Sequence, residues 1–118
     1  MTPIANAILN CKINIAIFLL HQQNFDIENL NRIYNQDDTI LSLVIKHCPE
    51  HDGLFQTIVE FQVLDENGEM INAIKDSTLN QLSTDTEYSQ QSLLMMATRR
   101  ELINFVYFLS RSPRINVK

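Results

Sequence analysis

The sequence predicts an all-α fold in which short helices follow one another in tight pairs. Apolar residues make up 45% and charged residues 19% of the 118 residues, which is enough to bury the core of one domain. Only two glycines and three prolines occur, whereas a β-sandwich or barrel needs frequent turn signals. Apolar side chains also recur at helical spacing in short blocks. We therefore expect residues 1–118 to form a single helical domain.

The first pair of helices is expected at residues 4–10 and 13–21. Both blocks are apolar, and only residues 11–12 separate them. A polar stretch follows at residues 22–32.

The second pair is expected at residues 38–48 and 52–64. Asp38 and Asp52 can cap these helices, because a carboxylate accepts hydrogen bonds from the free N–H groups of a first turn. Pro49 should end the first of the two helices, since proline disfavours a helical conformation in the residue before it.

The stretch after residue 64 has two competing interpretations. Residues 65–68 (DENG) form a turn signal, and we expect an amphipathic helix at residues 69–82. The competing prediction is a β-hairpin over residues 61–71, because Asn-Gly lies there between two apolar runs. Residues 83–91 are expected to be a loop. The helix rests on the three-to-four spacing of Met70, Ile71, Ile74, Leu79 and Leu82.

Residues 92–117 should hold the third pair, whose second helix is apolar on most of its faces. Phe105, Val106, Tyr107 and Phe108 follow one another there. One helix cannot bury all four against a single neighbour, so part of this helix should be exposed and could meet another chain.

Three stretches of the chain repeat one pattern. They start at Thr2, Thr39 and Ser92, and in each an isoleucine or leucine follows two residues later. In the first and third copies an alanine comes five residues after the start, and a second apolar block begins eleven residues after it, at Ile13 and Ile103.

This pattern resembles the ankyrin repeat, whose first helix opens with Thr-Pro-Leu as Thr2-Pro3-Ile4 does here. The resemblance implies a short solenoid of helical hairpins, with an irregular insertion near residues 62–91. The starts lie 37 and 53 residues apart instead of about 33, and Cys11, Cys48 and Glu101 stand where the family has glycine. The repeat-like units are expected at residues 2–31, 37–64 and 90–117, with residues 65–89 as the insertion.

The ankyrin resemblance also implies a function. Members of the family bind other proteins through a concave face and its loops, so we expect a protein–protein interaction module without catalysis. The resemblance assigns Ala5, Ser42 and Met95 to that face, and the insertion would add specificity.

Four further residues are candidate partner contacts. Arg99 and Arg100 could meet an acidic peptide or a phosphate. Tyr107 and Phe108 lie on the apolar last helix, through which the chain could also pair with itself. A self-assembling structural domain is therefore an alternative function.

A second alternative is a small metal-binding or enzymatic domain that uses His47, Cys48 and His51. Adjacent side chains on one helix point about 100° apart, and a structural zinc site needs four ligands. Cys48 is expected at a helix C-terminus, where the helix dipole disfavours the thiolate. The sequence contains neither GxxxxGK[ST] nor GxGxxG. We accordingly expect no catalytic residue, metal or cofactor.

Charge and cysteine usage bear on partners and compartment. The net charge of −5 argues against a nucleic-acid partner, which needs a basic footprint. The charge is uneven: residues 50–87 carry nine acids and one base, whereas residues 99–118 carry five bases and one acid. Cys11 and Cys48 are expected to be reduced and buried, and no signal peptide or apolar span is visible. We expect a cytoplasmic protein without a membrane, or an effector that acts in a host cytosol.

Overall fold

The computed structural model describes residues 2–34, 37–86 and 89–115, and these ranges are mostly helical. The helices are α1 (Pro3–Leu9), α2 (Ile13–Leu20), α3 (Glu28–Asn31), α4 (Ile40–His47), α5 (Asp52–Glu60), α6 (Asp76–Leu79), α7 (Leu93–Arg99) and α8 (Ile103–Arg111). Two small antiparallel sheets accompany them, so the expected all-α class needs correction. They pair β1 (Gln62–Leu64) with β2 (Met70–Asn72) and β3 (Ser83–Thr86) with β4 (Ser89–Gln91).

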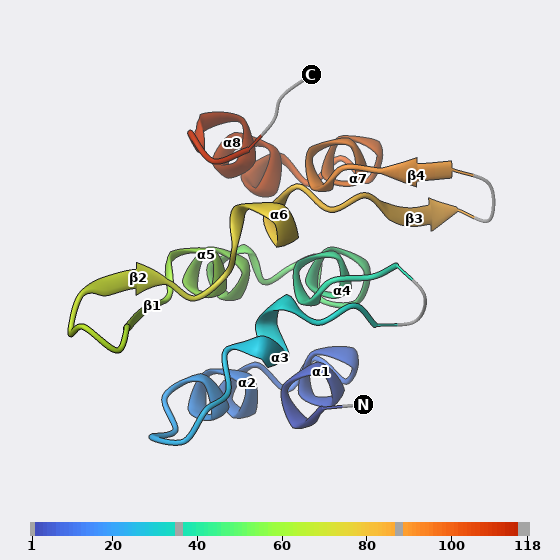
Figure 1. The fold of residues 1–118 in the computed structure, drawn as a ribbon. Coiled ribbons are helices and arrows are strands. Elements are labelled where there is room, and N and C mark those ends of the chain that lie inside the picture. The colour runs from blue at the N-terminus through green and yellow to red at the C-terminus, as the bar shows by residue number, and fades with distance from the viewer. Residues whose placement is uncertain (1, 35–36, 87–88, 116–118) are drawn as a thin grey trace.

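Six of the helices form three layers of two, namely α1 with α2, α4 with α5, and α7 with α8 (Figure 1). In each layer the first helix opens on a hydroxyl residue whose side chain accepts a hydrogen bond from a backbone N–H three residues later. Thr2 accepts from the amide of Ala5, and Thr39 and Ser92 do the same in the second and third layers. The three residues at which the repeated pattern starts therefore cap the first helix of each layer.

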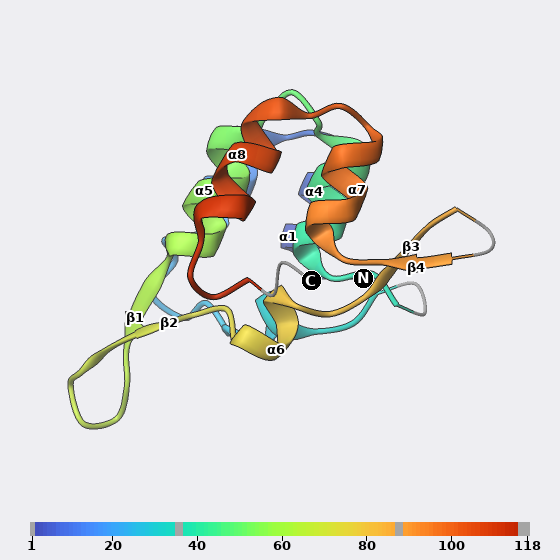
Figure 2. The ribbon, with the colours of Figure 1, turned by 90° about the horizontal axis from the view of Figure 1, so that it is seen from above.

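Seen from above, α1, α4 and α7 form one row, and α5 and α8 lie together in the other (Figure 2). The turn between the two helices of a layer is short. In the first and third layers it contains a residue with positive φ, Cys11 at 52° and Glu101 at 58°. Such a left-handed residue ends a helix abruptly and lets the chain fold back at once. Cys48, at the corresponding turn of the second layer, has a φ of −130° instead.

Two short helices, α3 and α6, lie on the connections between layers and are built alike (Figure 1). Leu30 and Leu79 are both buried. The asparagine after each leucine donates to the carbonyl four residues earlier and to a carbonyl of a later segment. Asn31 reaches the carbonyl of Ala73 at 2.9 Å, and Asn80 reaches that of Arg114 at 2.9 Å. A Leu-Asn pair therefore fastens each connection to the chain that follows.

The expected helix over residues 69–82 is wrong, and the competing hairpin is confirmed. The β1–β2 hairpin projects from one side of the stack, and β3–β4 projects from the other (Figure 2). Asp65 accepts from the amides of Asn67 and Glu69, and Gly68 takes a φ of 80°, so the DENG segment closes the hairpin turn. Within the expected helix, only α6 is helical.

Three smaller predictions also need correction. The helix expected over residues 52–64 ends at Glu60, because residues 62–64 pair with β2. Residues 83–91 are expected to be a loop, but 83–86 and 89–91 form the two strands of the second sheet. The residues at the N-cap positions of α4 and α5 are Thr39 and His51, each one position from the expected aspartate, and of the two only Thr39 makes a side-chain capping hydrogen bond.

The core is continuous through all three layers. Phe55 of α5 packs edge-on against Phe105 of α8, with ring centroids 5.0 Å apart. None of the helices in the described ranges combines the length and apolar character that crossing a bilayer requires.

Candidate functional site

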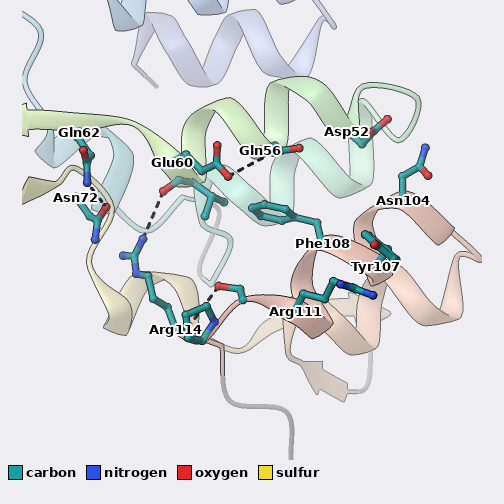
Figure 3. A pocket seen from close by; sticks show the side chains of 13 residues that line it. Asp52, Gln56, Glu60, Gln62, Asn72, Asn104, Tyr107, Phe108, Arg111 and Arg114 are labelled. Carbon is teal, nitrogen blue, oxygen red and sulfur yellow. Dashed lines mark hydrogen bonds between the residues drawn. The ribbon is translucent and has the colours of Figure 1, made fainter.

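A surface cavity of about 740 Å³ lies between α5 and α8 (Figure 3). We call it the α5–α8 groove. The base of the β1–β2 hairpin and the segment after α8 complete it. Its lining residues are Asp52, Gln56, Val59, Glu60, Gln62, Asn72, Asn104, Tyr107, Phe108, Arg111, Ser112, Pro113 and Arg114.

The α8 wall of the groove combines aromatic and basic side chains. The guanidinium carbon of Arg111 lies 4.3 Å from the centre of the Tyr107 ring, which is a cation–π distance. Phe108 is half-buried and meets the ring of Phe55 edge-on at 6.2 Å. Tyr107 is 59% exposed, so part of its side chain is accessible to a ligand.

The α5 wall is acidic and rich in amides. Asp52, Gln56 and Glu60 come from α5. Gln56 donates to a carboxylate oxygen of Glu60 at 3.3 Å, and Gln62 donates to Asn72 at 3.4 Å across the base of the hairpin (Figure 3). Both bonds are long and exposed, so a competing ligand could replace them at small cost.

Arg114 closes the groove at its hairpin end and joins three segments. Its Nε donates to the carboxylate of Asp76 at 2.6 Å, and Nη1 donates to the carbonyl of Val59 at 3.4 Å. Its Nη2 donates to the carbonyl of Ile74. Most of the donors of Arg114 are used within the chain. Its role is therefore to hold these three segments together at the end of the groove.

The hairpin beside the groove carries exposed apolar side chains. Leu64 and Met70 form a cross-strand pair next to the turn and are 66% and 58% exposed. Gln62 and Asn72, the pair at the other end of the same strands, line the groove. Leu64, Met70, Gln62 and Asn72 alternate with Val63 and Ile71, so they share one face of the hairpin. The groove and this apolar face are therefore continuous.

The positions taken from the ankyrin resemblance are mostly inaccessible. Ala5 and Ser42 are fully buried, and Met95 is 46% exposed. The Ser42 hydroxyl accepts from the amide of Thr39 and donates to Asp38, so it serves the helix cap. A partner cannot contact Ala5 or Ser42 in this structure, and the expectation for these two residues is corrected.

The other expected contacts fall in two places. Tyr107 and Phe108 line the α5–α8 groove. Arg99 and Arg100 are exposed around the turn between α7 and α8 and are not among the lining residues. The last helix is partly exposed, as the sequence predicts: Ile103 is 79% exposed, whereas Phe105 is buried.

The His47–Cys48–His51 cluster does not converge. His47 is exposed, His51 is half-buried, and Cys48 is buried. Within the described residues, no group of three or more His, Cys, Asp or Glu side chains is arranged to hold a metal ion. Cys48 lies instead against Cys11 of the first layer, and burial raises the pKa of its thiol to about 12. Cys11 is exposed, contrary to expectation, and both thiols are free.

A polar network joins the connections that precede the second and third layers. The Nζ of Lys46 lies 2.7 Å from a carboxylate oxygen of Asp38 and also donates to the carbonyl of Thr84. The Thr84 hydroxyl donates to Asp37 and lowers the pKa of that carboxyl. This network positions the β3–β4 sheet against α4.

Comparison of the chain with protein-family models, curated protein sequences and solved structures finds no match.

Sequence reasoning missed the acidic and amide wall of the groove. The sequence indicates only a capping role for Asp52, and Gln62 and Asn72 belong to no motif. One sequence feature recurs in the two equivalent connections: Leu-Asn occurs at residues 30–31 and 79–80. The same dipeptide also occurs at residues 9–10, at the end of α1, so it does not mark the connections by itself.

Proposed function

We propose that this chain is a protein–protein interaction module, built as a short ankyrin-like stack, which binds an extended segment of a partner protein without catalysis. The arrangement of three helix pairs in layers supports the ankyrin-like architecture. The left-handed residues Cys11 and Glu101, where the family has glycine, support it as well. Protein binding is the function that this resemblance implies.

The observation that carries the proposal is the continuity of the α5–α8 groove with the apolar face of the β1–β2 hairpin. Four carboxamide side chains line the groove, and each offers both a donor and an acceptor, as a peptide backbone does. Acidic side chains on one wall and Arg111 on the other can pair with charges of either sign. The hairpin adds apolar area that a partner can bury. The four carboxamides belong to Gln56, Gln62, Asn72 and Asn104.

We therefore assign partner binding to the α5–α8 groove and the adjoining hairpin face, instead of the concave face that the ankyrin resemblance implies. Ala5 and Ser42 are buried, which leaves Met95 as the accessible residue of the three. The sequence analysis expects the insertion to determine which partner binds. Within the insertion, we assign this role to the β1–β2 hairpin. Residues 73–91 include side chains buried in the core, among them Ile74 and Leu79, and therefore belong to the scaffold.

Affinity capture with three immobilised chains tests the proposal. The first is the natural chain. In the second, residues 62–72 are replaced by Asn-Gly, which can join Phe61 to Ala73 because the Ala73 amide already donates to the Phe61 carbonyl at 2.9 Å. The third is Ile15→Ser/Phe18→Ser, which removes exposed apolar side chains of α2 away from the groove.

We expect one or more proteins from a lysate of the source cells to be retained by the first and third chains and lost from the second. Capture of the same proteins by all three chains would show that the hairpin is not the specificity element. Failure of the natural chain to retain any protein above a blank support would contradict the interaction function. Circular dichroism of each chain establishes that the variants are folded.

A further inference from the structure

Cys11 and Cys48 bring the first two layers into contact at their turns. The residues are 37 positions apart in the sequence, yet their Sγ atoms lie 2.9 Å apart. The contact is reciprocal. The Cys11 thiol donates to the carbonyl of His47 at 2.6 Å, and the Cys48 thiol donates to the carbonyl of Ile8 at 3.0 Å.

The two thiols differ in accessibility. Cys48 is 1% exposed, whereas Cys11 is exposed and lines a surface cavity of about 570 Å³ together with Lys12 and His51. A reagent can therefore reach Cys11 but not Cys48. The ammonium group of Lys12 favours the approach of an anionic reagent.

We propose that Cys11 and Cys48 form a reversible disulfide, with a low-molecular-weight disulfide as the oxidant, and that this bond locks the first layer to the second. A disulfide S–S bond is about 2.05 Å long, so the sulfurs need to approach by roughly 0.9 Å. A thiol pair this close avoids most of the entropy cost of bringing the groups together.

The exchange takes place in two steps. The Cys11 thiolate attacks one sulfur of the oxidant RSSR, which forms Cys11–S–S–R and releases RS⁻. The Cys48 thiol then attacks Sγ of Cys11 and expels the second thiolate, which takes up the Cys48 proton and leaves as RSH. The two cysteines lose two electrons, and the oxidant gains them as two RSH.

Burial determines the order of these steps. Burial keeps Cys48 protonated and inaccessible to the oxidant, so Cys11 is the thiol that attacks the oxidant first. Cys48 acts second, when the sulfur it attacks is already beside it. The Cys11–Cys48 disulfide should form under oxidising conditions, and the two free thiols should be present under reducing conditions.

The test is incubation of the folded natural chain with excess oxidised glutathione at pH 8, followed by intact mass and peptide mapping. We expect a chain that has lost two hydrogens, carries no glutathione and yields a Cys11–Cys48 cross-linked peptide. The midpoint of thermal unfolding should rise by roughly 10 °C, because the bond closes a long loop of the unfolded chain, and dithiothreitol should reverse the rise.

Two variants test the order of attack. Cys48→Ser should accumulate one glutathione on Cys11, and Cys11→Ser should stay unmodified while folded. If either variant fails to fold, brief treatment of the natural chain with iodoacetamide replaces it and should label Cys11 before Cys48. A natural chain that keeps both thiols, stops at the glutathione adduct or forms only intermolecular disulfides would overturn the proposal.

Discussion

Replacing Asn31 by alanine should destabilise the fold more than its half-buried position suggests. The side chain joins the connection after the first layer to the segment that follows the hairpin. Its Oδ1 accepts from the amide of Lys75 at 2.9 Å and from the hydroxyl of Thr78 at 2.7 Å. Its Nδ2 donates to the carbonyl of Ala73 at 2.9 Å and to that of Ile27 at 3.2 Å.

The magnitude follows from the three bonds that Asn31 makes to the segment after the hairpin. Each is worth about 1 kcal/mol net, and Thr78 is buried, so its hydroxyl cannot turn to water instead. Asn31→Ala should therefore lower the free energy of unfolding by about 3 kcal/mol. That is a large share of the 5–15 kcal/mol typical of a whole domain.

Urea denaturation followed by circular dichroism measures this loss. Asn31→Asp retains the two acceptor contacts and should lose less than Asn31→Ala. The matched control is Asn24→Ala, at an exposed position of the preceding loop, which should change the free energy by less than about 0.5 kcal/mol. An Asn31→Ala variant as stable as Asn24→Ala would refute the idea that this asparagine joins the layers.

Three further predictions concern single positions. Glu101→Gly should raise the free energy of unfolding by about 1 kcal/mol in urea denaturation, because glycine adopts the positive φ of this turn without steric cost; a decrease would contradict the left-handed turn. The pKa of the Cys48 thiol is raised in the fold, so its contribution to stability is complete below about pH 9 and is lost as the pH rises toward about 12. Thermal unfolding of the natural chain should show this alkaline loss, and that of Cys48→Ser should show less of it. Thr84→Val should raise the pKa of the Asp37 carboxyl toward 3.8 in an NMR titration, because the variant lacks the hydroxyl that donates to this carboxylate. In the natural chain the hydrogen bond stabilises the fold above pH 3.8, and this stabilisation is lost as the pH falls through the lower pKa that Asp37 has in the folded state. An unchanged pKa of Asp37 in the variant would contradict the hydrogen bond.

How far the sequence predicts the fold depends on which contacts are local. The caps at Thr2, Thr39 and Ser92 are predictable because each acts on an amide three residues away. The stop at Pro49 is local too. The segment after Phe61 was harder, because its apolar residues fit a helical period by chance.

The turn chemistry of residues 65–68 decides that segment in favour of a hairpin. Asp65 supplies its own acceptor for two amides of the turn, and Gly68 adopts a φ that most residues avoid. Met70 and Ile71 are exposed on the hairpin, whereas Ile74 and Leu79, which follow it in the sequence, are buried in the core. The apparent periodicity therefore combined residues of two different structural segments.

The candidate site was only partly predictable. Tyr107 and Phe108 stood out because a single helix cannot bury a run of large apolar residues. The opposite wall depends on α5, which is far away in the sequence, and no local pattern shows that Gln56 and Asn104 line one groove. The Cys11–Cys48 contact is of the same kind, since it exists only when two layers stack.

The affinity of a captured partner for the hairpin variants tests the central claim most directly. Leu64→Ser/Met70→Ser removes apolar area from the hairpin, and Ile15→Ser/Phe18→Ser removes area of similar exposure from α2. If a partner buries the remaining exposed area of Leu64 and Met70, each contributes about 1 kcal/mol, so the Kd should rise about 30-fold. For the α2 variant we predict a change of less than about threefold. Equal Kd values for the natural chain and the hairpin variant would contradict the account.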